Sequence, residues 1–273
     1  MSSPYSRLDR PPLNSRALRR ALLVPNGLWT ALELVDRTES TNADVAAAAR
    51  DGAAEGLVVV AEQQTAGRGR LGRQWESPPR AGLAVSVLLR PTPAVPVGRF
   101  GWLPLLAGVA LTETVRRLGE VEAALKWPND LLVDERKCAG ILAEAQPDGA
   151  VVLGIGLNVT LEREELPRPD ATSLALAGAA CTDRDPLLRA LLRELAAWYR
   201  RWREVAGDPE TSGLREAYRI GCATLGTPVT VTLPRGGTLT GTASDVDGDG
   251  RLLVTHGDQT VTAVASGDIV HLR

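Results

Sequence analysis

Short apolar runs separated by turn residues dominate the first part of the chain. The run at 57–61, Leu-Val-Val-Val-Ala, is apolar and mostly β-branched, which predicts a buried strand. Runs of the same kind predict further strands at 82–89, 125–133, 139–145 and 150–158. Because the connections between the last three are short, we expect neighbouring strands to pair in antiparallel fashion.

Other stretches repeat their apolar positions with helical spacing. A short amphipathic helix is predicted at 15–23, and an alanine-rich helix ends near Arg50. Ser40 or Thr41 can cap the second helix, and the same hydroxyl groups can also face a ligand at its N-terminus. Longer helices are predicted at 98–118, ended by Gly119, and at 186–205.

This arrangement of strands and helices predicts the α+β class, with a mixed, mainly antiparallel sheet and helices on one side. From about Thr224 the pattern changes to short alternating strands with glycine-rich turns, which is typical of a small β-barrel. The predicted organisation is an N-terminal extension with a short helix at 1–30, a main domain at 31–223 and a barrel at 224–273.

Composition and charge restrict the class of protein. With 273 residues and 44% hydrophobic content, the chain can bury a sizeable core. Its formal net charge of −2 argues against a protein that holds nucleic acid by its phosphates, and residues 1–30 are too few for a helix-turn-helix module. No segment approaches the run of about 20 apolar residues that spans a bilayer. We therefore expect neither DNA nor a membrane as a partner.

Cysteines and histidines narrow the chemistry further. Cys138, Cys181 and Cys222 are odd in number and widely spaced, which indicates a reducing compartment and no structural zinc. Charged residues interrupt the start of the chain, so we expect no signal peptide and a cytoplasmic location. The two histidines, His256 and His271, lie near the C-terminus. This excludes most hydrolase schemes, because a serine or cysteine nucleophile usually needs a histidine base.

The segment at 67–75, Gly-Arg-Gly-Arg-Leu-Gly-Arg-Gln-Trp, follows the predicted strand at 57–61. Its glycines let the backbone approach a ligand closely, and its guanidinium groups suit carboxylate or phosphate. Three neighbouring cations repel one another, so we expect an anion among them. A solvated loop or a non-specific nucleic-acid contact is the alternative interpretation.

The same segment also matches the pattern Gly-x-Gly-x-x-Gly of dinucleotide-binding proteins. That fingerprint needs a helix that opens at the loop and directs its amide groups at a pyrophosphate. Here Trp75-Glu76-Ser77-Pro78-Pro79 follows, which does not start a helix. We therefore expect phosphate to be bound by the arginine side chains.

Two further stretches combine polar residues with predicted strands. Lys126-Trp127-Pro128-Asn129-Asp130 lies at a strand end, and Lys137 leads into an apolar strand. Gly154-Ile155-Gly156-Leu157-Asn158 ends another strand. A third stretch, 245–250, imitates the start of a calcium-binding loop, but its twelfth position is His256 where a glutamate is required. We interpret it as a hairpin turn.

Taken together, these stretches resemble the biotin protein ligases. The resemblance rests on Ser40-Thr41-Asn42, Gln63-Gln64, the segment 67–75 with Ser77-Pro78, Lys126 to Asp130, Lys137 to Leu142, and Gly154 to Asn158, in the order found in that family. It implies a catalytic domain of the class II synthetase and biotin ligase type, followed by an SH3-like barrel. It also implies the monofunctional type without an N-terminal DNA-binding domain.

The resemblance implies a two-step reaction. The biotin carboxylate attacks the α-phosphate of Mg-ATP, giving biotinyl-5′-AMP and pyrophosphate, and a lysine of a biotin carboxyl carrier domain of a carboxylase, such as acetyl-CoA carboxylase, then takes the biotinyl group. Mg²⁺ is the implied cofactor, and biotin is a substrate. The oligomeric state stays open, with a homodimer as one option.

The resemblance also assigns roles to residues. Lys137, Arg70 and Arg73 would be catalytic, and Asp130 would contact Mg²⁺. The biotin-binding residues would be Ser40, Thr41, Asn42, Gln64, Gly67, Arg68, Gly69, Arg70 and Lys137. The residues that bind ATP or the adenylate would be Arg70, Arg73, Trp75, Lys126, Asn129, Asp130, Lys137 and Asn158.

Two departures from the family and two alternative functions remain. Thr65-Ala66 replaces a more polar pair, and Arg80 stands where glycine is common, which puts the path of the chain after the loop in doubt. A lipoate or octanoyl ligase or transferase shares the fold. A non-catalytic nucleotide- or nucleic-acid-binding module would need stacking surfaces, which are scarce with one phenylalanine and three tyrosines.

Without ligand, we expect 67–75 to be mobile.

Overall fold

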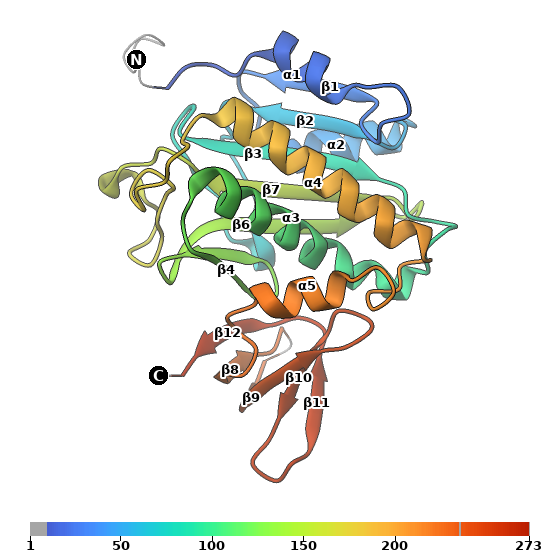
Figure 1. Cartoon of the computed structure of the whole chain (residues 1–273), viewed down its shortest axis with the longest axis vertical. Helices are drawn as coiled ribbons and strands as arrows, with labels where there is room; N and C mark the ends of the chain where they lie inside the picture. The colour runs from blue at the N-terminus through green and yellow to red at the C-terminus, as the bar shows by residue number, and fades with distance from the viewer. Residues whose placement is uncertain (1–9, 235, 273) are drawn as a thin grey trace.

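The computed structural model describes residues 10–234 and 236–272 and contains two sheets (Figure 1). The larger sheet has seven strands in the order β1-β2-β3-β7-β6-β5-β4, and the smaller has five in the order β11-β10-β9-β8-β12. The helices are α1 (Ser15–Leu22), α2 (Thr41–Arg50), α3 (Trp102–Gly119), α4 (Arg184–Glu204) and α5 (Leu214–Gly221), with short 3-10 turns η1 (Arg70–Gly72), η2 (Val97–Gly101) and η3 (Arg163–Glu165). The strands are β1 (Ala31–Val35), β2 (Leu57–Ala61), β3 (Gly82–Leu89), β4 (Ala123–Lys126), β5 (Asp130–Val133), β6 (Arg136–Ala145), β7 (Val151–Asn158), β8 (Pro228–Thr232), β9 (Thr238–Val246), β10 (Leu252–Thr255), β11 (Val261–Val264) and β12 (Asp268–His271).

The larger sheet is mixed and mainly antiparallel, as predicted. β1 and β2 pair in parallel because α2 connects them as a crossover, and the other neighbours pair antiparallel. The predicted strand at 125–133 is wrong as a single strand. It is the hairpin of β4 and β5, which turns at 127–129, where Pro128 lacks the N–H that a continuing strand would use. β1 and α5 were not predicted.

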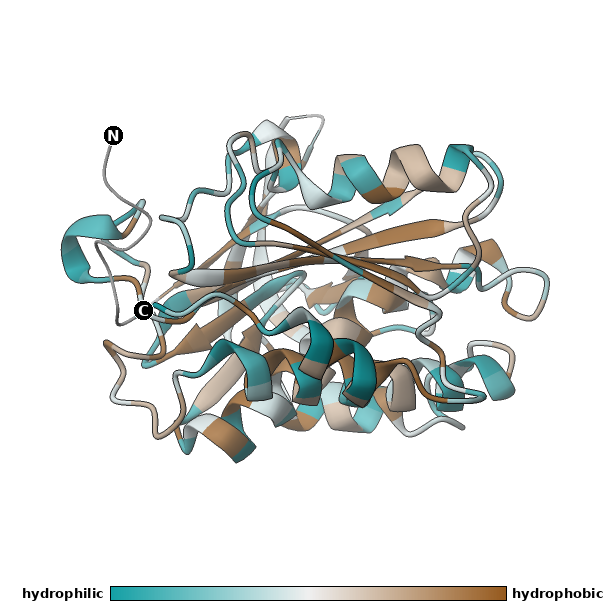
Figure 2. Cartoon of the chain, turned by 90° about the horizontal axis from the view of Figure 1, so that it is seen from above, coloured by the Kyte–Doolittle hydropathy of each residue, from teal (hydrophilic) through white to brown (hydrophobic). Residues whose placement is uncertain are grey.

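Helices cover both faces of this sheet, so the expectation of helices on one side is wrong in one respect. α1, α3 and α4 pack on the face that carries the main core, whereas α2 packs on the opposite face (Figures 1 and 2). On that opposite face Val45 of α2 contacts a separate apolar cluster that contains Val59 of β2. Both faces of β2 are therefore buried, which explains its unbroken apolar sequence.

The five-stranded sheet is joined to the larger one at the end of β4. Leu125 forms a bridge with Cys222, and the backbone N–H of Ala223 donates to the carbonyl oxygen of Leu125 at 2.8 Å. A second junction is the turn between β9 and β10, where the carbonyl oxygen of Gly248 accepts a 2.9 Å hydrogen bond from the indole of Trp102. The stretch that imitated a calcium loop is thus a hairpin turn that fastens the smaller sheet to the start of α3.

No helix within residues 10–234 and 236–272 is long and apolar enough to cross a membrane. The predicted N-terminal helix is α1, and the first nine residues of the predicted extension lie outside the described residues. α1 packs against α4 through Leu18 and Leu22, which are buried.

Candidate active site

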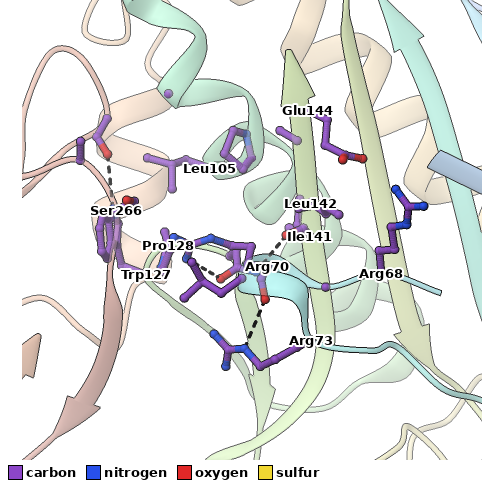
Figure 3. Close-up of a pocket in the computed structure, with 18 of the residues that line it drawn as sticks. Arg68, Arg70, Arg73, Leu105, Trp127, Pro128, Ile141, Leu142, Glu144 and Ser266 are labelled. Atoms are coloured by element: carbon purple, nitrogen blue, oxygen red, sulfur yellow. Dashed lines mark hydrogen bonds between the residues drawn. The ribbon is translucent and has the colours of Figure 1, made fainter. Parts of the chain in front are cut away.

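A cavity of about 950 Å³ lies between the loop that follows β2, the turn between β4 and β5, the start of α3 and the five-stranded sheet (Figure 3). Of the residues predicted to bind biotin or nucleotide, Gly67, Arg68, Gly69, Arg70, Arg73 and Asn129 line it. The smaller sheet contributes Asp249, Gly250, Arg251, Ala265 and Ser266. A smaller pocket beside it is lined by Gln63, Gln64, Trp75, Ser77 and Gly82 among others.

A row of small residues crosses four strands on the face that carries this site. The sheet register places Ala61, Ala84, Gly156 and Gly140 side by side on β2, β3, β7 and β6. The indole of Trp75 lies on this row: a Cβ added to Gly156 would be 2.3 Å from Cε2 of Trp75, and one added to Gly140 would be 3.2 Å from Cζ3. The row is therefore a flat floor that admits a planar ring.

A second row carries polar groups to the N-terminus of α2. Ser86, buried in the middle of β3, lies 2.6 Å from Oδ1 of Asn42 and 2.7 Å from Oγ1 of Thr41. Its neighbour across the sheet is Gly154, whose missing side chain leaves room for Asn42, since a Cβ there would be 2.0 Å from Oδ1 of Asn42. The amide of Asn42 donates to Oε2 of Glu144 at 2.6 Å. This network fixes the start of α2.

Gln64 is held by its carbonyl oxygen, which leaves its amide nitrogen available to a ligand. Oε1 of Gln64 accepts hydrogen bonds from the backbone N–H of Thr41 at 2.9 Å and lies 3.0 Å from the Thr41 hydroxyl. Ser40 occupies the N-cap position of α2 but makes no side-chain capping bond. Neither hydroxyl caps the helix, so the capping interpretation is wrong, and contact of Ser40 and Thr41 with a ligand stays a prediction.

The three arginines of the loop point to separate partners. Arg70 donates to Oδ1 of Asn129 at 3.2 Å and to the carbonyl oxygen of Gly267, and Arg73 forms a 2.5 Å ion pair with Asp268. Arg68 lies on the Glu144 side of the cavity, away from the other two (Figure 3). Burial lowers the pKa of the Arg70 guanidinium from its ordinary value, and Asp268 opposes this effect. Arg68 is therefore separated from the other two, whereas Arg70 and Arg73 stay close enough for the charge of Arg73 to lower the pKa of Arg70 further.

Lys137 lies at the edge of the glycine floor. Its Nζ forms a 2.6 Å ion pair with Oδ1 of Asp130 and lies 5.9 Å from the centre of the Trp75 ring. Its backbone is held by the segment at 170–172, because its N–H donates to the carbonyl oxygen of Asp170 and its own carbonyl accepts from the N–H of Thr172, both at 2.8 Å. The ammonium group is thus presented from a rigid strand.

Five of the predicted nucleotide-binding residues do not line the cavity, namely Trp75, Lys126, Asp130, Lys137 and Asn158, and the last and Lys126 have other partners. The side chain of Asn158 is buried, and its amide donates to the carbonyl oxygen of Thr172 at 2.9 Å, so it anchors the segment that holds Lys137. Lys126 is half-buried, and its positive charge helps to lower the pKa of Asp170 and that of His271. Neither position was distinguishable from a ligand contact by sequence, because both stand at strand ends.

The chain that follows the loop at 67–75 accommodates Arg80 at the position where glycine is common in the family that the chain resembles. Arg80 has φ of 62°, the left-handed conformation that glycine adopts most readily, and its N–H donates to the carbonyl oxygen of Glu62 at 2.8 Å. The sequence departure is therefore absorbed locally, at a cost on the order of 1 kcal/mol.

The described residues do not form a resident metal site. No group of three or more histidine, cysteine, aspartate or glutamate side chains within them could hold a metal ion, and the carboxylate of Asp130 is already paired with Lys137. Magnesium commonly binds through one or two carboxylates together with substrate phosphates.

Several contributing residues were missed in the sequence. Ser86 is a lone polar residue in an apolar strand, which is a signal that could have been used. Asp268 and Glu144 carried none, because their partners lie on distant segments.

Comparison with known proteins identifies the family of this chain. A family model described as the biotin/lipoate A/B protein ligase family matches residues 34–160, and one described as the biotin protein ligase C-terminal domain matches residues 224–272. The chain is 48% identical over 269 residues to the biotin-[acetyl-CoA-carboxylase] ligase of Mycobacterium tuberculosis, and the match covers 97% of each chain. The chain belongs to the biotin protein ligase family.

Solved structures of the family have the same fold. The biotin protein ligase of Aquifex aeolicus in complex with biotin and ATP matches with a TM-score of 0.73 and 28% identity, over 90% of this chain and 100% of that one. The enzyme of Leishmania major in complex with biotinyl-5-AMP matches with a TM-score of 0.58 and 25% identity, over 87% of this chain and 99% of that one. The predicted family and the mainly antiparallel α+β fold are confirmed, apart from the face on which α2 packs, and the match of residues 224–272 favours biotin over lipoate.

Proposed function

We propose that this ligase binds biotin and ATP side by side at the floor and cavity described above and joins them in two steps. In the first, a biotin carboxylate oxygen bonds to the α-phosphorus while the bond to pyrophosphate breaks. In the second, a lysine amine of a biotin carboxyl carrier domain bonds to the acyl carbon, and AMP leaves with the electron pair of the broken bond. The observation that carries the proposal is Lys137 at the edge of a flat glycine floor, beside a cavity lined by Arg70 and Asn129.

The biotin half is assigned to the floor and to the start of α2. The compact fused rings of biotin suit the row of Ala61, Ala84, Gly156 and Gly140 once the indole of Trp75 has moved off it. The ureido group of biotin offers both N–H donors and a carbonyl acceptor, and Gln64, Thr41 and Ser40 offer the complementary groups. Polar groups placed in an otherwise apolar slot reject ligands that leave them unpaired. Gly67, Gly69 and Arg68 close the slot from the loop, and Asn42 orients α2.

The nucleotide half is assigned to the wall that carries Arg70, Arg73 and Asn129. Negative charge grows on the α-phosphate during attack, and fixed cations lower the barrier when they are already aimed at it. Lys137 is paired with Asp130 in this structure, so a carboxylate or phosphate would compete with Asp130 for the ammonium group. Trp75 would pack over the ligands, and Asp130 would face the Mg²⁺ that accompanies ATP.

The proposal also covers the cellular location of the reaction, the acceptor protein and the oligomeric state. A cytoplasmic location fits an enzyme that consumes ATP, and Cys138, Cys181 and Cys222 are free thiols. The acceptor is a biotin carboxyl carrier domain of a carboxylase, as the name of the Mycobacterium tuberculosis relative indicates for that protein. Neither DNA binding nor membrane binding is part of the proposed activity, and a homodimer is the assembly to test for.

A single labelling experiment tests the activity. The protein is incubated with ATP, biotin and an isolated biotin carboxyl carrier domain, and the carrier is analysed by mass spectrometry. The expected result is addition of one biotinyl group that depends on ATP. Parallel reactions with lipoate in place of biotin separate the two members of the fold. Modification by lipoate with none by biotin would overturn the proposal.

A further inference from the structure

The last strand of the smaller sheet, β12, contacts the cavity at its start and the junction of the two sheets at its end. At its start, the carbonyl oxygen of Gly267 accepts from Arg70, and Asp268 pairs with Arg73. At its end, Nε2 of His271 lies 3.0 Å from Oγ1 of Thr224. β12 has four residues, so its two ends lie on the order of 10 Å apart. One short strand thus connects the arginine loop with the junction of the two sheets.

Thr224 in turn contacts the turn between β4 and β5. Thr224 is fully buried, and its hydroxyl oxygen accepts a hydrogen bond from the backbone N–H of Trp127 at 3.1 Å. Trp127 is buried as well, and its indole donates to the carbonyl oxygen of Gly250 at 3.3 Å. The next two residues of the turn, Pro128 and Asn129, line the cavity. The Thr224 hydroxyl therefore fixes the backbone that carries part of the nucleotide wall.

The hydrogen-bond roles can be assigned from chemistry. A backbone N–H can only donate, so the oxygen of Thr224 accepts from Trp127, and its own proton is free to point to His271. That arrangement requires a neutral His271 with its proton on Nδ1. Burial, and then the charge of Lys126, lower the pKa of His271 below its ordinary value, while Glu135 opposes them. Val229 of β8 is its uncharged cross-strand neighbour.

We propose that Thr224 and His271 are positioning residues for the nucleotide half of the site. Neither lines the cavity. Thr224 holds the backbone at Trp127, and His271 orients the Thr224 hydroxyl so that its oxygen faces that N–H. The inference rests on the proposed function for the place of the nucleotide. It explains why the smaller sheet would matter for adenylate formation.

The test compares two substitutions at one buried position. Thr224→Val keeps the shape and removes the hydroxyl, whereas Thr224→Ser keeps the hydroxyl. We expect Thr224→Val to raise the KM for ATP in biotin-dependent pyrophosphate exchange about five- to tenfold, with the KM for biotin little changed. Thr224→Ser restores the wild-type value, and Thr230→Val on the neighbouring strand β8 is the matched control.

The pH dependence supplies a readout that a purely structural role would not change. As the pH falls through the pKa of His271, the protonated ring loses its capacity to accept the Thr224 proton, so the KM for ATP rises. His271→Gln keeps an acceptor oxygen that does not titrate and should remove this rise. Equal effects of Thr224→Val on both substrates, no rescue by serine, or an unchanged pH profile in His271→Gln would overturn the inference. Absence of biotin-dependent exchange in the wild-type protein would instead overturn the proposed function.

Discussion

Gly156→Ala tests the floor formed by Ala61, Ala84, Gly156 and Gly140, because the added methyl group would collide with a known neighbour. Its Cβ would lie 2.3 Å from Cε2 and 2.6 Å from Nε1 of Trp75, where ordinary contacts between carbon atoms are about 3.5 Å or more. The indole would have to lift by about 1 Å or more. A ligand ring on the same floor would meet the same methyl group.

The expected magnitude follows from the cost of overpacking. Forcing an extra methyl group into a packed site costs about 1–3 kcal/mol, and each 1.4 kcal/mol is tenfold in affinity. We therefore expect the Kd for biotin, measured by calorimetry, to rise by about ten- to a hundredfold, while cooperative thermal unfolding is retained. Gly257→Ala is the matched control, since a Cβ at that position meets nothing within 4 Å.

A double-mutant cycle identifies the cause. If the methyl group acts through Trp75, then Gly156→Ala should add little to the effect of Trp75→Ala on the Kd for biotin. Full additivity would show that the methyl group acts on the ligand alone. A Kd for Gly156→Ala equal to that of the wild-type protein would refute the assignment of biotin to this floor.

Two other predictions concern the charged groups of the site. Lys137→Ala should slow adenylate formation by about 10²–10³ in single-turnover assays and weaken biotin binding much less, whereas Arg136→Ala, an exposed neighbour, should change neither; equal losses in rate and binding would mark Lys137 as a ground-state contact. Amide hydrogen exchange at 67–75 should slow when biotin is added and should be faster in Asp268→Asn, which loses the ionic partner of Arg73. Equal protection with and without biotin would contradict the predicted ordering of the loop.

Much of the local structure was predictable because it is encoded by neighbouring residues. The apolar run of β2 and the alternating pattern after Thr224 predicted strands without knowledge of their partners. The arginine loop was predictable as an anion-binding candidate, because its residue types alone carry that chemistry. The face on which α2 packs was not predictable, because β2 is apolar on both faces and offers no preference between them.

Two residues at strand ends that had the same predicted role differ in the structure because their tertiary contacts differ. Lys137 and Asn158 were both predicted to bind the nucleotide. The structure places Lys137 at the edge of the floor, whereas it turns the side chain of Asn158 to a backbone carbonyl. The difference depends on the segment at 170–172, which no local pattern connects with either residue.

By itself the sequence determined the family, the order of most elements and the chemical character of the loop at 67–75. These properties reside in residue types and short spacings, which survive without a folded chain. Only the tertiary structure decided which residues share the site. The floor exists because sheet register puts Gly140 beside Gly156, and Arg73 meets Asp268 because the smaller sheet docks against the cavity. Such contacts join positions far apart in the chain, and their geometry is set by packing of whole elements.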